Sequence, residues 1–153
     1  MPPLGGEARS AWGARVSRRG LIVLAHGARD ASWAAPFEAM VARVRERAPD
    51  AEVRLAFLEL MAPRLEQAGD ELAALGCTRI DVVPAFLGMG GHVRRDVPAQ
   101  LAALRLAHGG IFWQLHDALG ETPHVIAALA DATIDLAGLG FASGHSPLDG
   151  IAT

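Results

Sequence analysis

The sequence predicts an α/β domain in which helices cover both faces of a four-stranded, mostly parallel sheet. Short apolar runs rich in β-branched residues alternate along the chain with segments of helical periodicity. This strict alternation favours parallel strands joined by right-handed crossovers. A length of 153 residues is enough for one domain whose core needs no disulfide or metal.

The elements follow from local patterns of apolar residues, glycine and proline. Apolar runs predict strands at residues 21–25, 52–58, 80–86 and 111–116. Helical spacing predicts helices at residues 32–48, 63–75, 96–108 and 124–136. Pro36 is tolerated only in the first turn of a helix, and Pro63 suits the first turn of the next one. Gly76 and Gly109 mark helix ends.

The ends of the chain lack these patterns. Residues 1–19 mix Pro, Gly, Arg and Ser, and we expect a flexible leader there, followed by one domain over residues 20–137 and a flexible tail over residues 138–153. The first 19 residues do not resemble a secretory signal, and no run of 18 apolar residues predicts a membrane span. These features favour a cytoplasmic protein without a membrane partner.

Composition narrows the functional classes further. The formal charge of −3 and the pI near 6.0 provide no basic surface for nucleic acid. Cys77 is the single cysteine, which excludes an intrachain disulfide and a zinc site made of several cysteines. We interpret Cys77 as a small, half-buried apolar residue in the loop before a strand, rather than as a nucleophile.

Polar side chains follow three of the predicted strands. They are His26 after the first strand, Glu59 after the second and His92 after the third. The carboxyl ends of parallel strands share one edge of the sheet, where ligands of open α/β sheets bind, so we expect these groups to face one cleft. Imidazole and carboxylate bind first-row transition metals and also act as bases. His116, after the fourth strand, is a further candidate.

Glycines and arginines surround these candidates. The segment 88–91 contains Gly88, Gly90 and Gly91 before a helix, where backbone N–H groups could hold a phosphate or where a large flat ligand could approach the backbone. It matches neither the dinucleotide fingerprint nor the Walker pattern. Arg29 and Arg94, with the neighbouring Arg95, are candidates for binding the carboxylates of an acidic ligand.

Two histidine motifs and two shorter motifs carry a family resemblance. They are Ala25-His26-Gly27-Ala28-Arg29-Asp30; Phe57-Leu58-Glu59-Leu60 followed by Pro63; Val83-Pro84-Ala85-Phe86-Leu87 with Gly90-Gly91-His92-Val93-Arg94-Arg95-Asp96-Val97-Pro98; and Leu119-Gly120. Through these motifs the chain resembles the small sirohydrochlorin chelatases, which are class II tetrapyrrole chelatases. The resemblance covers about residues 20–136 and implies a chelatase-like, flavodoxin-like three-layer α/β/α fold.

The resemblance implies insertion of Co²⁺ or Fe²⁺, with Ni²⁺ as a further option, into sirohydrochlorin for cobalamin or sirohaem biosynthesis. It assigns His26 and His92 to metal binding or to accepting pyrrole protons, assisted by Glu59, and implies no organic cofactor. Ala28 stands where the family often has Ser. The short members of the family work as homodimers, so we expect a homodimer whose second copy closes the cleft.

Two other functions use the same residues. A metal or tetrapyrrole carrier without catalysis would need the same histidines. A flavodoxin-like nucleotide or phosphate binder would instead use the glycines of residues 88–91. We expect Trp33 and Phe86 to be core residues that border the cleft.

Overall fold

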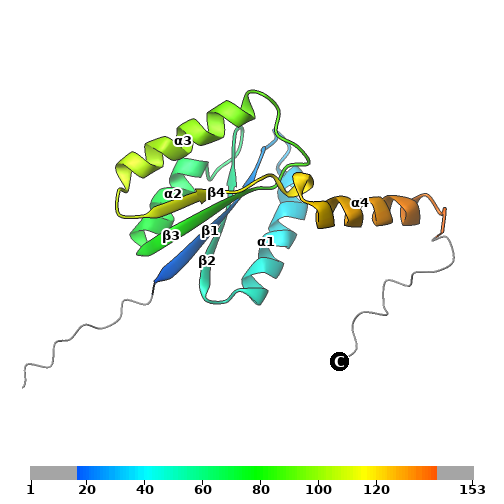
Figure 1. The fold of residues 1–153 in the computed structure, drawn as a ribbon, viewed down its shortest axis with the longest axis horizontal. Helices are drawn as coiled ribbons and strands as arrows, with labels where there is room; N and C mark the ends of the chain where they lie inside the picture. Colours follow the sequence, from blue (N-terminus) through cyan, green and yellow to red (C-terminus); the bar gives the residue numbers. More distant parts are fainter. Residues whose placement is uncertain (1–16, 141–153) are drawn as a thin grey trace, which may run out of the picture.

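A four-stranded parallel sheet forms the centre of the molecule. The computed structural model describes residues 17–140, and its strands are β1 (Arg18–Ala25), β2 (Ala51–Phe57), β3 (Cys77–Pro84) and β4 (Phe112–Leu115). They lie in the order β2-β1-β3-β4, and every neighbouring pair is parallel. The predicted α/β fold is therefore confirmed (Figure 1).

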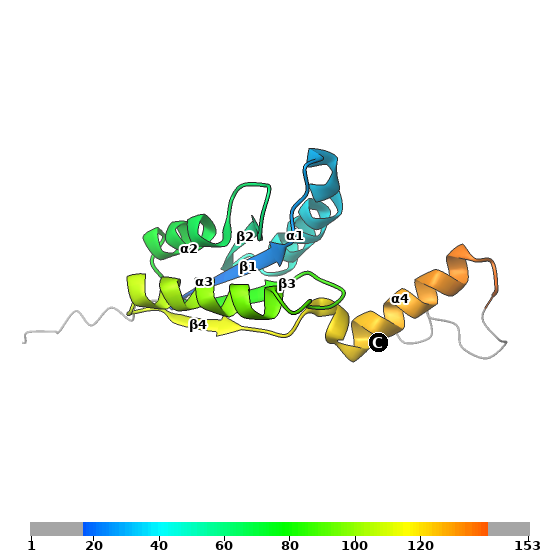
Figure 2. The same ribbon diagram turned by 90° about the horizontal axis from the view of Figure 1, so that it is seen from above.

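Four α-helices and two short 3₁₀ helices connect the strands. The α-helices are α1 (Ala35–Arg47), α2 (Leu65–Ala74), α3 (Val93–Ala107) and α4 (Pro123–Leu136), and the 3₁₀ helices are η1 (Ala31–Ala34) and η2 (Leu119–Glu121). Figure 2 shows α2 and α3 together over one part of the sheet, with α1 apart from them. Within residues 17–140, no helix combines the length and the apolar character needed to cross a membrane.

Alternation along β1 divides the core into two layers. Ile22 and Leu24 are completely buried in the cluster that α2 and α3 form over one face. Val23 points to the other face and packs with Val41 of α1 and Val53 of β2. Period-two alternation in the central strand thus buries both of its faces, as expected for a parallel sheet covered by helices.

The boundaries of several elements differ from the prediction. β1 begins at Arg18, so Arg18 and Arg19 of the predicted leader pair with neighbouring strands, and Cys77 opens β3 instead of preceding it. α3 begins at Val93, because buried Val93 and Val97 anchor its first turns, and Pro98 lies inside it. The remainder of the predicted leader, and the predicted tail after residue 140, lie outside the described residues.

Candidate functional site

His26 lies directly after β1, at the carboxyl edge of the sheet. Its half-buried imidazole stacks on the ring of Phe86, with 4.1 Å between the ring centroids and 29° between the ring planes. Phe86 is 4% exposed and belongs to the core cluster under α2 and α3. The imidazole therefore rests on a fixed surface, which limits the orientations that it can adopt.

The backbone beside His26 is joined to the segment that carries Glu59. The Glu59 N–H donates to the His26 carbonyl oxygen over 2.9 Å. Gly27 has φ of +92°, and a Cβ at this position would lie 1.8 Å from the Glu59 carbonyl oxygen. Only glycine fits here, because it tolerates positive φ and allows this close approach. The Glu59 side chain itself is exposed.

His92 is presented at the start of α3. It occupies the N-cap position, its imidazole is exposed, and it makes no capping hydrogen bond. The next residue, Val93, is completely buried and fixes the first turn of the helix. The backbone of the core thus positions His92 while its side chain remains available to a ligand.

Arg94 connects the glycine segment 88–91 to η2. Its Nε donates to the Met89 carbonyl oxygen over 2.9 Å, and its Nη2 donates to Glu121 Oε1 over 2.8 Å. The guanidinium thus already binds two acceptors of the protein. Arg29 and Arg95 are exposed, which leaves them better placed than Arg94 to meet an acidic ligand.

The strand order brings the predicted site residues to one edge. β2, β1 and β3 are neighbours, so the segments with Glu59, His26 and His92 leave adjacent strand ends. Their side chains do not form a closed ligand set: residues 17–140 contain no group of three His, Cys, Asp or Glu side chains that could hold a metal ion. These segments therefore supply separate donors instead of a closed metal site.

His116, the further candidate after the fourth strand, binds a buried carboxylate within the sheet. Its Nε2 lies 2.9 Å from Asp81 Oδ1, and Arg19 and Arg79 donate to the same carboxylate. Burial raises the pKa of Asp81, but hydrogen bonds from Arg79, His116 and Arg19 outweigh it and hold the pKa well below its usual range. The sequence pattern missed this cluster, because Asp81 lies within an apolar strand. Glu121 was missed as well, since nothing local links it to Arg94.

Other residues from the sequence analysis have structural roles. Asp30 caps η1, where hydrogen bonds from the Ser32 hydroxyl and N–H lower the pKa of its carboxyl. Cys77 is 2% exposed, and burial together with the Glu52 carboxylate raises the pKa of its thiol. The thiol stays protonated, which supports the interpretation of Cys77 as an apolar residue. Trp33 packs on Phe37, with ring centroids 4.8 Å apart.

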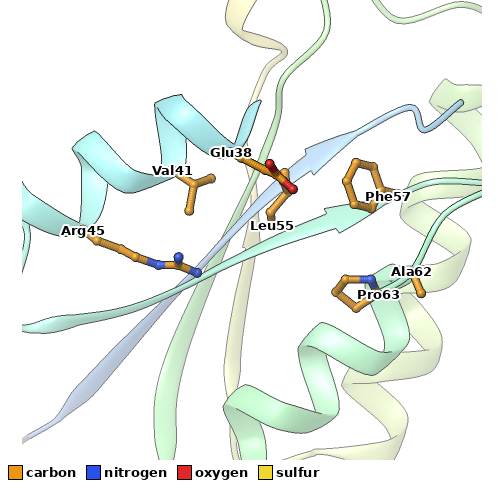
Figure 3. Close-up of a pocket in the computed structure, with 7 residues that line it drawn as sticks. All are labelled: Glu38, Val41, Arg45, Leu55, Phe57, Ala62 and Pro63. Atoms are coloured by element: carbon orange, nitrogen blue, oxygen red, sulfur yellow. The ribbon is translucent and has the colours of Figure 1, made fainter. Parts of the chain in front are cut away.

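A pocket of about 320 Å³ lies between α1 and β2 (Figure 3). Glu38 and Arg45 of α1 line one side, with Leu55 and Phe57 of β2 and Pro63 opposite. Neither His26 nor His92 lines it. The pocket therefore belongs to the side of the outer strand β2, separate from the candidate site.

The fold and the site together define a class: parallel α/β proteins that present histidines at adjacent strand ends. Comparison with known families makes the assignment specific. The chain belongs to the CbiX family, whose sequence profile matches residues 20–136.

Several similar proteins are sirohydrochlorin chelatases. The chain is 30% identical over 87 residues to the sirohydrochlorin cobaltochelatase of Methanosarcina acetivorans, covering 57% of this chain and 67% of that protein. It is 28% identical over 81 residues to the sirohydrochlorin ferrochelatase of Priestia megaterium, covering 53% and 30%. The matched region spans between 54% and 67% of the archaeal cobaltochelatases from Methanothermobacter thermautotrophicus and Methanosarcina acetivorans.

The fold also agrees with a solved structure of this family. A CbiX protein from Marinobacter aquaeolei VT8 superposes with a TM-score of 0.70 and 31% sequence identity, over 80% of this chain and 99% of that chain. The chelatase-like fold implied by the motifs is thus confirmed.

Proposed function

We propose that this protein is a sirohydrochlorin chelatase that inserts Co²⁺ or Fe²⁺ into the tetrapyrrole. The observation that carries the proposal is the placement of His26, stacked on Phe86, beside the strand end that leads to His92, within a CbiX-family fold. The names of the similar proteins, which include a cobaltochelatase and a ferrochelatase, support this reaction and leave both metals in the proposal.

Metallation exchanges two pyrrole protons for one divalent cation. Two N–H bonds break, two protons pass to bases, and the metal leaves its earlier ligands for four ring nitrogens. Histidine suits both tasks, because imidazole exchanges protons near neutral pH and binds first-row metals reversibly. We assign His26 and His92 to accepting protons and holding the incoming metal, with Glu59 contributing a carboxylate.

The open edge also suits a flat and acidic substrate. A Cβ at Gly91 would meet no atom within 4 Å, and one at Gly90 would meet only the His92 ring at 3.9 Å. These two glycines leave room for a macrocycle to approach the backbone. Exposed Arg29 offers a bidentate partner for substrate carboxylates. Arg94 contributes indirectly, by fixing the glycine segment through Met89.

A second copy of the chain completes the proposal. The edge with His26 and His92 is open in one protomer, and the family resemblance implies a homodimer. We infer that the working unit is a homodimer in which the second protomer borders the tetrapyrrole.

Anaerobic absorbance spectroscopy tests the activity. Sirohydrochlorin is mixed with Co²⁺ or with Fe²⁺ and a catalytic amount of protein, and the change in the tetrapyrrole spectrum is followed beside a reaction without protein. We expect multiple turnovers, reduced ~10²-fold or more in His26→Ala and in His92→Ala, the usual scale for losing a positioned proton acceptor. Turnover at the wild-type rate in either variant would contradict the assignment.

His108→Ala is the matched control. His108 lies at the opposite end of α3 from His92 and pairs with Asp70 of α2 over 2.7 Å. We expect wild-type turnover in this variant. Stoichiometric binding of metal or sirohydrochlorin without acceleration would instead identify the protein as a carrier. Stabilisation by a nucleotide or flavin alone would favour the phosphate-binding alternative.

A further inference from the structure

Helix α4 carries a mostly apolar surface that the other residues of the described range 17–140 leave uncovered. None of its residues is buried, and Ile126, Leu129 and Leu136 are 52%, 45% and 90% exposed. Its two carboxylates, Asp131 and Asp135, are four residues apart and share one narrow stripe. A single helix of 14 residues is marginal in water without a packed face, so α4 needs a partner surface.

Within the described residues, one face of the sheet is covered only in part. α1 packs over β1 and β2, through Val41 against Val23 and Val53. On the same side, β3 carries the buried Asp81, and β4 carries Phe112, which is 54% exposed. A hollow of about 640 Å³ lies here, next to the C-terminal end of α1. Parallel sheets are normally covered on both faces, so a further helix would be expected to pack over this region.

The connection before α4 directs the helix away from this hollow. The Gly120 N–H donates to the Phe86 carbonyl oxygen over 2.8 Å, and a Cβ on Gly120 would lie 2.2 Å from the Leu87 carbonyl oxygen. The Thr122 hydroxyl donates to the Leu119 carbonyl oxygen over 2.6 Å. η2 is thus held on the carboxyl edge, and Figures 1 and 2 both show α4 extending from it away from the sheet.

We propose that α4 of each protomer packs into the hollow beside β3 and β4 of a second copy of this chain. The exchange is reciprocal, so a twofold axis relates two identical contacts, as in most homodimers. Charge favours this occupant. The hollow is lined by four arginines, Arg18, Arg19, Arg47 and Arg79, and by only two aspartates, Asp50 and Asp81, so its lining stays positive although Arg19 and Arg79 pair with Asp81. In contrast, α4 carries two aspartates and no lysine or arginine.

The exchange also places the second copy beside the candidate site. α4 leaves from η2, which Arg94 ties to the glycine segment through Glu121. A protomer that binds α4 therefore lies on the side of the edge that carries His26 and His92. The inference builds on the homodimer of the proposed function and specifies its interface. The test of this interface measures molecular mass, whereas the test of the proposed function measures metallation. The interface can therefore be refuted in a protein that is active, and it can be supported in a protein that is inactive.

Light scattering of the full chain at micromolar concentration tests the interface. We expect a dimer for the wild type and a monomer for Leu129→Asp and for Phe112→Asp, which change the two opposing surfaces. Ala128→Asp is the matched control: it adds the same charge to α4 on the stripe of Asp131 and Asp135, and we expect it to stay dimeric. Circular dichroism confirms that each variant is folded. A monomeric wild type, or a folded dimer in both Leu129→Asp and Phe112→Asp, would overturn the proposal.

Cross-linking between differently substituted chains identifies the contact. Leu129→Cys chains are mixed with Phe112→Cys chains and treated with a short bis-maleimide, with wild type as the background for the buried Cys77. We expect covalent dimers mainly in the mixture. Covalent dimers that form equally well from Leu129→Cys chains alone would show that two α4 helices pack on each other. A third sample contains chains that carry both Leu129→Cys and Phe112→Cys. A cross-link that forms only within these single chains would show that α4 folds back on its own sheet. Either result would refute the exchange.

Discussion

The imidazole of His26 stacks on the buried ring of Phe86, with the two centroids 4.1 Å apart. This contact joins the end of β1 to the segment after β3, and it gives a half-buried histidine a fixed support on one face. A catalytic base has to be held within a narrow range of positions, because small displacements cost large factors in rate. If His26 is the proposed base, Phe86 is its positioning residue.

Phe86→Leu tests this role. Leucine keeps most of the apolar volume and removes the flat ring, so we expect a stability loss of about 1 kcal/mol and a loss of about tenfold in metallation turnover. Absorbance assays and urea unfolding measure the two effects. A histidine NMR signal of His26 that shifts in the variant would tie the rate loss to the imidazole.

Phe37→Leu serves as the control for Phe86→Leu. Phe37 also packs on an aromatic ring, that of Trp33, at a tilt of 37°, and it lies against the cluster of Ala25, Ala34 and Phe57 instead of on the His26 ring. We expect its turnover to match that of the wild type. If both variants lose rate equally, the loss reflects general weakening of the fold and Phe86 has no special role.

Gly27→Ala should disrupt the junction between the His26 and Glu59 segments. The new Cβ would lie 1.8 Å from the Glu59 carbonyl oxygen, at a residue with φ of +92°. We expect a loss of about 3 kcal/mol or more, from the clash added to the strain of positive φ. Gly76→Ala is the control, because Gly76 has φ of +80° and open space around it. It should lose only about 1 kcal/mol. Equal losses in urea unfolding would remove the clash from the explanation.

Arg94→Gln should loosen the glycine segment without unfolding the protein. The guanidinium is 61% exposed in its contact with Glu121, so we expect a stability loss below about 1 kcal/mol. Hydrogen exchange of residues 88–92 should become faster, because the bond to the Met89 carbonyl oxygen is lost. Arg95→Gln, at a neighbouring exposed position, should leave this exchange unchanged. Identical exchange in the two variants would argue against the tether.

The fold could be predicted because its signals are local. Apolar runs and helical periodicity are encoded within single elements, and together they predicted the strands, the helices and the parallel sheet. Boundaries were less certain, since they depend on distant contacts. Arg18 and Arg19 extend β1 because β2 and β3 offer pairing partners, and α3 begins early because Val93 finds a place in the core. The exposure of α4 could not be predicted, because its pattern of apolar residues is also typical of a helix buried in its own domain.

The candidate site was predictable only in part, for the same reason. Topology places the ends of adjacent parallel strands together, so the sequence could predict that the segments carrying His26, Glu59 and His92 leave adjacent strand ends. The hydrogen-bond partners of individual side chains could not be predicted in this way. The pairing of Arg94 with Glu121 and that of His116 with Asp81 have no signal in the sequence. Such pairings depend on side-chain geometry across strands and loops.

Asp81→Asn should destabilise the protein in a way that depends on pH. Hydrogen bonds from Arg79, His116 and Arg19 prevail over burial and lower the pKa of Asp81 from its ordinary 3.8. A lowered pKa in the native state stabilises the fold above the unfolded-state value and loses that effect as pH falls. We therefore expect a deficit of about 1–3 kcal/mol at pH 7, constant down to about pH 5 and shrinking below about pH 4. Urea unfolding across this range measures it, with exposed Asp117→Asn as control. A deficit that stays constant to pH 3 would show that the carboxylate charge contributes nothing to stability.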